Sequence, residues 1–237
     1  MRRGTETLPS PNIWHWPDVY EVENRAQDVH GDVWRLLRGV ADWTGRDVVD
    51  IGCGTGFHLP RFAADARQVT GVEPYEPLVR LAENRVAGLP NVRVLTGPAQ
   101  RLPLPDASVD VAHARTAYFF GPGCEPGLAE VERVLRPGGV LVVVDLDVRH
   151  RPYGDWMRAD LPEYDPVEVD RFFERMGFDR RTVETRWRFA DRASLESVLR
   201  IEFSSRVADR AARDVRGLDF PVGYRVLTRR KPTGLIV

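Results

Sequence analysis

The stretch Val48–Phe57 constrains the fold more than any other part of the chain. Its residues are Val-Val-Asp-Ile-Gly-Cys-Gly-Thr-Gly-Phe, so a short apolar run leads directly into three glycines at every second position. The apolar run predicts a buried strand over 47–51, and the glycines predict a tight turn followed by a helix over 57–65. A strand, a glycine turn and a helix are typical of an α/β fold that binds a polar ligand where the helix begins.

A second strand, predicted over 69–73, ends in an acid, Glu73. The acid lies about twenty residues after the first glycine, the spacing at which a βαβ unit puts a carboxylate beside a ribose. The register of the glycines then separates two kinds of nucleoside cofactor. A dinucleotide fingerprint that starts at Gly52 requires a glycine where Phe57 stands, so a nicotinamide enzyme is the competing interpretation and not the preferred one.

The alternation of strand and helix continues through the middle of the chain and predicts a parallel sheet covered on both faces. The predicted strands of this part cover 92–96, 109–114 and 140–146, and the predicted helices cover 77–87 and 126–136.

The two flanks are predicted separately. A helix over 18–30 would begin with a capping box of Asp18 and Glu21, and a second helix would cover 32–38 and stop at Gly39. In the C-terminal part, the sequence predicts a helix from Asp165 to Gly177, a strand over 183–189, a helical stretch over 191–216 and a strand over 222–230.

Four segments resemble the class I, Rossmann-like methyltransferases that depend on S-adenosylmethionine (SAM), in particular the type found in ubiquinone and menaquinone biosynthesis. Gly52, Gly54 and Gly56 are similar to motif I of that family, and Glu73 is similar to its ribose-binding acid. The segments 101–110 (Arg-Leu-Pro-Leu-Pro-Asp-Ala-Ser-Val-Asp) and 130–141 also follow the family pattern, and all four matches occur in family order over residues 48–146.

The resemblance implies an α/β, doubly wound, mostly parallel seven-stranded sheet whose last strand is antiparallel, with helices on both faces. It also implies a single methyltransferase domain over residues 1–237. Within it we expect an N-terminal helical arm over 1–40, a SAM-binding core over 41–147, and a C-terminal part over 148–237 with a helical insertion between strands six and seven on the acceptor side.

By the same resemblance, the glycine turn holds SAM, Asp50 orients its methionine end and Glu73 accepts the ribose hydroxyls. Pro74 follows in the same loop, and Tyr75 either lies against the adenine or is exposed. The family usually has Gly-Asp-Ala before its next motif, whereas this chain has Gly-Pro-Ala-Gln over 97–100. Because proline has no N–H, the backbone of Ala99 or Gln100, or the Gln100 side chain, must contact the adenine.

Candidates for the acceptor side follow the end of strand four: His113, Arg115, Thr116 and Tyr118. His113 is the best single candidate for a general base and Tyr118 for orienting the acceptor, although a lone histidine is as often structural. Asp145 and Asp147 are weaker base candidates. His15, together with the neighbouring tryptophans Trp14 and Trp16, either closes over the pocket or packs loosely.

The function implied is in-line methyl transfer to a small-molecule acceptor through an oxygen, nitrogen or carbon atom, with proximity as the main catalytic effect. The alternatives are a SAM-binding scaffold without turnover and an RNA methyltransferase. A net charge of −1, with an excess of about +7 in residues 171–237 from arginines that are scattered, does not favour nucleic acid. We expect no metal site, no membrane span, no signal peptide and a cytoplasmic location; the oligomeric state is left open.

Overall fold

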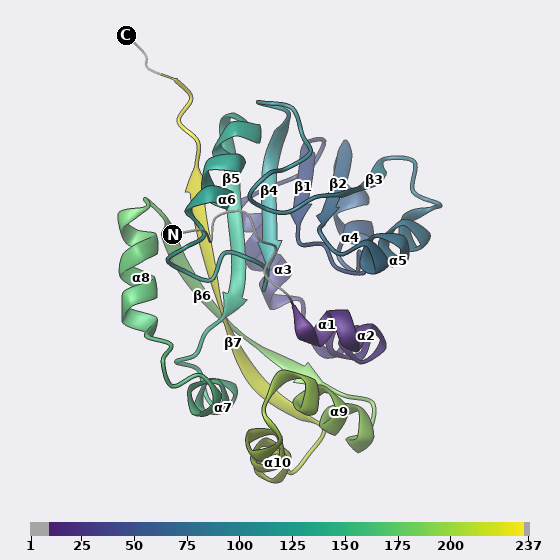
Figure 1. Cartoon of the computed structure of the whole chain (residues 1–237), viewed down its shortest axis with the longest axis vertical. Helices are drawn as coiled ribbons and strands as arrows, with labels where there is room; N and C mark the ends of the chain where they lie inside the picture. The colour runs from purple at the N-terminus through teal and green to yellow at the C-terminus, as the bar shows by residue number, and fades with distance from the viewer. Residues whose placement is uncertain (1–9, 235–237) are drawn as a thin grey trace.

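A seven-stranded sheet in the order β3-β2-β1-β4-β5-β7-β6 forms the centre of the computed structural model, which describes residues 10–234 (Figure 1). Strands β1 to β5 are parallel, and β7 runs antiparallel to both β5 and β6. The predicted fold class is confirmed. The strands are β1 (Asp47–Ile51), β2 (Gln68–Glu73), β3 (Val92–Thr96), β4 (Val109–Arg115), β5 (Leu135–Leu146), β6 (Asp179–Arg188) and β7 (Asp219–Arg230).

Helices cover both faces of this sheet. Two further helix pairs, over residues 11–26 and 192–214, lie beyond the carboxyl ends of the parallel strands (Figure 1). The described helices are α1 (Pro11–His15), α2 (Pro17–Ala26), α3 (Asp32–Val40), α4 (Leu59–Ala63), α5 (Glu76–Val86), α6 (Glu125–Val134), α7 (Tyr153–Asp160), α8 (Pro166–Arg175), α9 (Arg192–Glu202) and α10 (Ser205–Asp214). Among residues 10–234, none of them has the length and the apolar character that a membrane crossing requires.

Two hydrophobic cores lie on opposite faces of the sheet because side chains alternate along each strand. Val48 and Val111 belong to the core that includes α3 and α4, whereas Val49 and Ala112 belong to the core that includes α6 and α8. Both sets are almost fully buried. A strand that is apolar on both faces fits only in the middle of a covered parallel sheet, as the run before the glycines predicts.

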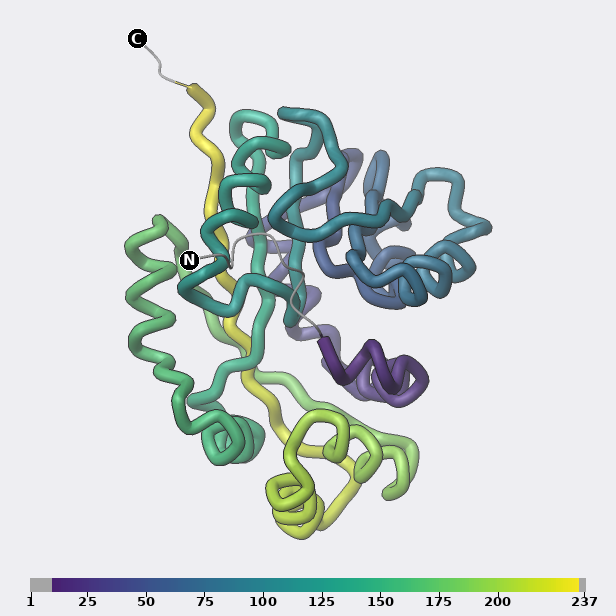
Figure 2. Tube along the Cα trace, viewed as in Figure 1, coloured from purple at the N-terminus to yellow at the C-terminus, as the bar shows by residue number. Residues whose placement is uncertain are grey.

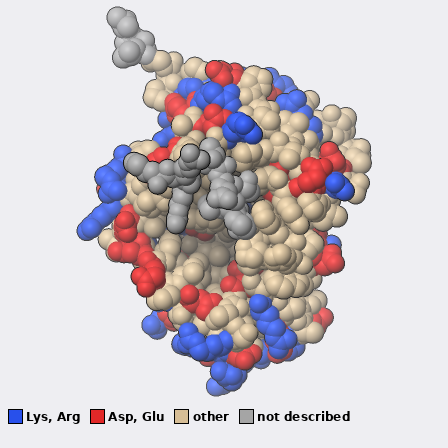
Figure 3. Space-filling view, in the orientation of Figure 1, with Lys and Arg blue, Asp and Glu red and all other residues tan. Residues whose placement is uncertain are grey.

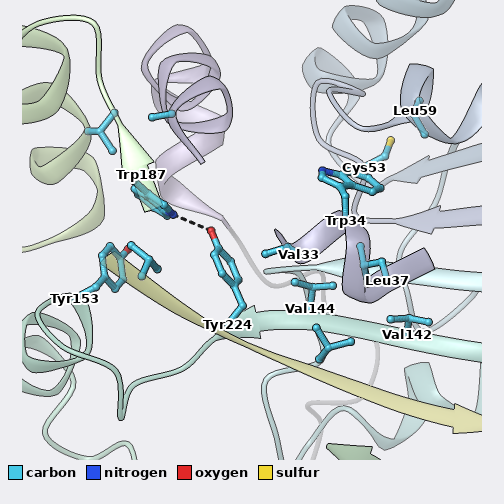
Figure 4. Close-up of a cluster of buried hydrophobic side chains, with 14 of the residues drawn as sticks. Val33, Trp34, Leu37, Cys53, Leu59, Val142, Val144, Tyr153, Trp187 and Tyr224 are labelled. Carbon is cyan, nitrogen blue, oxygen red and sulfur yellow. Dashed lines mark hydrogen bonds between the residues drawn. The ribbon is translucent and has the colours of Figure 1, made fainter. Parts of the chain in front are cut away.

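The first core extends into the C-terminal part of the chain, where β6 and β7 continue beyond the parallel strands (Figures 1 and 2). There the indole N–H of Trp187 donates a hydrogen bond of 2.9 Å to the hydroxyl of Tyr224, and the ring of Tyr153 lies beside them (Figure 4). This bond satisfies polar atoms that would otherwise be buried without a partner.

The helical stretch predicted over 191–216 is two helices, α9 and α10, with a break at Phe203 and Ser204. The backbone of Phe203 is extended, and the N–H of Ser204 donates to the carboxylate of Asp160 at the end of α7. A buried aromatic side chain and a tertiary hydrogen bond thus end α9, and neither has a local sequence signal.

The N-terminal helices also differ from the prediction. The predicted 18–30 helix begins one residue earlier, at Pro17, so Asp18 lies in its first turn and forms no capping box. It ends at Ala26 because Asp28 turns the chain with a positive φ and accepts the N–H of Val33. The helix predicted over 32–38 continues through Gly39 to Val40.

Two helices were not predicted: α1, inside the expected irregular arm, and α7. The part of the arm before Ser10 lies outside the described residues. Strand β5 begins five residues before the predicted start at 140, at Leu135, because Leu135 pairs with Val109 across an irregularity in the register. The division of residues 1–237 into one domain remains an interpretation.

Candidate functional site

The glycine turn after β1 has the left-handed backbone that only glycine adopts without strain. The φ angles of Gly52, Gly54 and Gly56 are 72°, 56° and 74°. A Cβ on Gly52 would lie 2.6 Å from the Cβ of Ala117, and one on Gly54 would lie 2.7 Å from the Cδ1 of Ile13. The turn is therefore packed closely against the loop after β4 and against α1, and it has no room for side chains.

Glu73, at the end of β2, forms hydrogen bonds that hold this turn in place. One carboxylate oxygen accepts the N–H of Gly54 at 3.0 Å and the other accepts the N–H of Tyr75 at 3.1 Å. Burial raises the pKa of Glu73, which these two N–H donors partly counteract. The carboxylate also faces the cavity, so its remaining lone pairs are available to hydroxyl donors of a ligand.

A cavity of about 400 Å³ lies along the carboxyl ends of β1 to β4. In a doubly wound sheet, ligands bind at this edge, where the strand order reverses between β1 and β4. Figure 3 shows a hollow on this face of the molecule, with acidic and basic side chains interspersed around it. The volume is within the range of small-molecule sites.

The cavity has two ends. One is lined by the glycine turn and by the loops after β2 and β3, and it includes Gly52, Gly54, Glu73, Pro74, Pro98, Ala99 and Gln100. The other is lined by α2 and by the loop after β4, and it includes Tyr20, Asn24, Gln27, Arg115, Thr116, Tyr118 and Phe120.

Helix α1 covers the first end of the cavity. Its Ile13 reaches the glycine turn, and Trp14 stacks on Tyr75 with the ring centroids 4.4 Å apart. On its other side, the amide of Asn12 donates to the carboxylate of Glu202 on α9 at 2.7 Å. The predicted closure over the pocket is therefore formed by Trp14, whereas His15 and Trp16 are not among the lining residues.

Helix α2 presents a polar face to the second end. Tyr20, Asn24 and Gln27 are spaced by four and three residues, which places them on one side of the helix. The amide oxygen of Gln27 accepts from Arg115 at 2.8 Å, and the Tyr20 hydroxyl lies 3.4 Å from the hydroxyl oxygen of Thr116. These contacts join α2 to the end of β4.

The loop after β4 is strained at this point. Thr116 and Tyr118 have φ angles of 46° and 55°, in the region that side-chain-bearing residues rarely occupy. Such conformations cost about 1–3 kcal/mol each and cluster at functional sites. The ring of Tyr118 packs against Gly127 of α6, at which a Cβ would lie 2.2 Å from the ring.

His113 and Asp50 do not line the cavity. They are paired in register across β1 and β4, and His113 Nδ1 lies 2.7 Å from an Asp50 carboxylate oxygen. His113 is 2% exposed, and its ring is packed against Phe62 and Trp34. This geometry favours a structural pair beneath the site over the predicted contacts of His113 with an acceptor and of Asp50 with SAM.

The other weaker candidates also lie outside the lining. Asp145 accepts from Arg225 at 2.5 Å, and Asp147 accepts the backbone N–H of Arg149. Gly56 contributes to the turn but does not face the cavity. The insertion helices contribute no lining residue either, and α9 instead supports α1 through Glu202.

Among the residues that line the cavity, sequence reasoning gave no role to Tyr20, Asn24 and Gln27 and took His58 as structural, whereas it placed Arg115 on the acceptor side. The spacing of polar residues along α2 was an available signal for Tyr20. His58 follows the glycine turn directly, and burial lowers its pKa well below the ordinary value, which favours the unprotonated ring. Arg115 is the last residue of β4, where this fold meets its ligands.

Comparison with known proteins identifies the central part of the chain. Residues 49–143 match the family described as a methyltransferase domain. This segment, which includes the glycine turn and Glu73, therefore resembles a methyltransferase domain. The close approach that Gly52 and Gly54 allow, and the free lone pairs of Glu73, fit SAM, the cofactor that the sequence resemblance implies.

Curated relatives and solved structures resemble this chain. The chain is 35% identical over 162 residues to a ubiquinone/menaquinone biosynthesis C-methyltransferase, UbiE, of Rubrivivax gelatinosus, covering 61% of this chain and 63% of the relative. A SAM-dependent methyltransferase of Aquifex aeolicus superposes with a TM-score of 0.58 and 22% identity, over 89% of this chain and 98% of the other. The [4+2]-cyclase SpnF superposes with a TM-score of 0.63 and 19% identity, over 97% and 100%.

The curated relatives are matched over only part of their length, from 38% to 66% for those with which the match is strongest. At 22% identity or less, the two solved structures compared above establish the fold alone.

Proposed function

We propose that this protein is a SAM-dependent methyltransferase that acts on a small-molecule acceptor. The observation that carries the proposal is the single cavity that connects the glycine turn and Glu73 with the polar face of α2 and the loop after β4. A donor held at the first end and an acceptor at the second would meet inside a covered space. Methyl transfer of this kind is catalysed mainly by proximity, orientation and exclusion of water.

The residues at the first end would hold SAM, which supplies an electrophilic methyl group when bound. Glu73 would accept the ribose hydroxyls, Pro74 would border them, and Gly52 and Gly54 would admit the cofactor close to the backbone. Ala99 and Gln100 would contact the adenine in place of the acid that relatives of this family usually have. Trp14 and Ile13 of α1 would exclude water from above.

At the acceptor end, we propose that Tyr118 orients the acceptor and that His58 accepts a proton where the acceptor is a phenol or an alcohol. His58 lines the cavity, and burial lowers its pKa, which keeps the ring unprotonated but also makes it a weaker base than an exposed imidazole. His113 is not among the residues that line the cavity and is hydrogen-bonded to Asp50 beneath it, so we do not assign it contact with the acceptor.

The Rubrivivax relative is named as a C-methyltransferase of ubiquinone and menaquinone biosynthesis, which favours phenolic or quinol acceptors. The cytoplasmic location remains a prediction; both cysteines, Cys53 and Cys124, are free and buried.

Calorimetric titration of the wild-type protein with SAM, S-adenosylhomocysteine and NAD tests the cofactor. We expect the two adenosyl ligands to bind and NAD not to bind, and binding of NAD alone would refute the proposal. Incubation with SAM carrying a labelled methyl group and a panel of phenols, quinols, amines and a transfer RNA transcript then tests turnover by mass spectrometry. Labelled small-molecule product is the expected result.

The proposal that His58 is the base can be tested with His113, a neighbouring buried histidine, as the matched control. His58→Gln should lower the turnover of a phenolic acceptor while S-adenosylhomocysteine affinity stays within about two-fold, because only proton transfer is removed. His113→Gln should lower the melting temperature instead, because it alters the partner of the buried Asp50. Equal turnover of His58→Gln and wild type would exclude His58 as the base.

A further inference from the structure

Arg115, at the acceptor end of the cavity, has a charge that no other described residue pairs with. The residue is 8% exposed, and the partner that the structure gives its guanidinium is an amide and not a carboxylate. Only Nη2 has a partner, the amide oxygen of Gln27, whereas Nε and Nη1 have none among the described residues. The Tyr224 hydroxyl also lies close to the guanidinium: burial raises the pKa of Tyr224, and the charge and hydrogen bonding of Arg115 lower it to a smaller extent, but Nε and Nη1 still have no partner in the described part of the chain.

The nearby acid, Glu23, forms no ion pair with Arg115. Burial and the neighbouring Glu202 raise the pKa of Glu23 well above its ordinary value, although the charge of Arg115 acts in the opposite direction. Its carboxyl accepts the amide N–H of Gln27 at 2.7 Å and not a guanidinium N–H. A buried guanidinium without a counter-ion is costly, and neutral neighbouring side chains do not remove that cost.

Arg225 shows what a buried arginine with a structural role looks like in the same molecule. It is 2% exposed and pairs with Asp145 at 2.5 Å. Arg115 differs because it lines the cavity, is surrounded there by the neutral side chains of Tyr20, Asn24 and Thr116, and keeps two donor nitrogens unoccupied. A ligand anion is the partner that this arrangement lacks.

On the basis of the proposed function, we infer that Arg115 binds a carboxylate carried by the acceptor molecule. A carboxylate fits better than a phosphate because Arg115 is the only lysine or arginine among the described residues that line the cavity, and a phosphate dianion usually calls for more positive charge. The aromatic rings of Tyr20, Tyr118 and Phe120 line the same end, so the acceptor would combine an apolar or aromatic body with one carboxylate.

The carboxylate of SAM itself is the rival partner. Its methionine part carries an ammonium group beside the carboxylate and is therefore neutral overall, which leaves a buried cation largely uncompensated. The two sources are separated by the cofactor affinity of an Arg115 variant, since only the rival assigns Arg115 to the cofactor.

Titrations in the presence of saturating S-adenosylhomocysteine test the inference with two isosteric pairs of probes: benzoate with benzamide, and propionate with propionamide. We expect at least one carboxylate to bind the wild-type protein roughly ten-fold or more tightly than its amide, as a charge-assisted hydrogen bond would require. Arg115→Met should abolish this preference, and Arg115→Lys should restore part of it. Arg80→Met, on the exposed side of α5, is the control and should keep the preference.

Three results would overturn the inference. The first is equal affinity for carboxylate and amide in both pairs, and the second is a preference for phenyl phosphate over benzoate. The third is a loss of S-adenosylhomocysteine affinity of ten-fold or more in Arg115→Met, which would assign Arg115 to the cofactor. Failure of the proposed function is a separate result, because the wild-type protein would then not bind S-adenosylhomocysteine at all.

Thermal unfolding of the same variants keeps the test interpretable. Arg115→Met should melt close to the wild-type temperature, because it removes an uncompensated charge, whereas Arg225→Met should melt much lower, because it leaves Asp145 buried without its partner. If Arg115→Met is as unstable as Arg225→Met, Arg115 is a structural residue and the inference is wrong.

Discussion

Replacing Gly52 with alanine probes the contact between the glycine turn and the loop after β4. The new Cβ would lie 2.6 Å from the Cβ of Ala117, and neither carbon can rotate away, because each is bonded directly to the backbone. The loop would have to move, together with its strained residues Thr116 and Tyr118. The substitution therefore disturbs the cofactor end and the acceptor end of the cavity together.

Two effects contribute to the loss of stability that Gly52→Ala causes. A Cβ at the φ of 72° observed for Gly52 costs about 1–2 kcal/mol, and overpacking costs about 1–3 kcal/mol more. Gly45→Ala isolates the first term, because Gly45 has a φ of 66° and open space around the added Cβ. In a chain of this size each kcal/mol shifts the melting temperature by about 2–4 °C, so Gly52→Ala should melt roughly 2–12 °C below Gly45→Ala.

The double variant Gly52→Ala/Ala117→Gly removes the atom that the new Cβ meets and should recover the second term. Thermal unfolding of the two single variants and the double variant forms a cycle whose coupling energy measures that contact. Titration with S-adenosylhomocysteine should follow the same order. If Gly52→Ala and Gly45→Ala melt together and the double variant recovers neither stability nor affinity, the loop after β4 does not pack on the turn.

Three further changes test other parts of the site. Glu73→Gln puts an amide N–H against the N–H of Gly54 or Tyr75 and should weaken S-adenosylhomocysteine roughly 10- to 100-fold by calorimetry. Trp14→Ala removes the stacked pair with Tyr75 and should weaken the same ligand by about 2- to 12-fold. The pKa of Glu23 is raised in the folded protein above its ordinary value of 4.5, so between these two values the folded state holds a proton that the unfolded state has lost. The melting temperature of the wild type should therefore fall relative to that of Glu23→Gln as the pH rises through this range.

Each of these changes has a control at an exposed position. Glu76→Gln, in the first turn of α5, should leave ligand affinity unchanged, and so should Trp16→Ala, which alters the exposed neighbour of Trp14. Glu83→Gln, on α5, should leave the pH dependence of melting unchanged. Parallel pH profiles of Glu23→Gln and the wild type would show that Glu23 is ionised in the folded protein.

The sequence was sufficient to predict the parallel core because its signals are local. Apolar strands next to left-handed glycines leave few alternatives, and β1, β2 and β3 begin and end within one residue of the predicted bounds. The N-cap of α8 was equally clear: the Asp165 side chain accepts the N–H groups of Val167 and Glu168, as the Asp-Pro-x-Glu pattern predicts.

The parts that sequence reasoning missed depend on tertiary contacts. Helix α1 is only five residues long and would be unstable alone; it forms where Ile13 and Trp14 find the glycine turn and Tyr75. The break between α9 and α10 depends on Asp160, more than forty residues away along the chain. No local pattern encodes either contact.

The assignment of the acceptor side shows why strand position alone is a weak guide to function. His113 and Arg115 are two residues apart on β4, so both side chains point towards the same face of the sheet. His113 lies one pleat deeper and meets Asp50, which stands directly opposite it on β1. Arg115 is the last residue of the strand and reaches the cavity, where Gln27 holds one of its nitrogens. At the edge of a parallel sheet, a shift of two residues therefore separates a buried structural pair from a side chain that can bind a ligand.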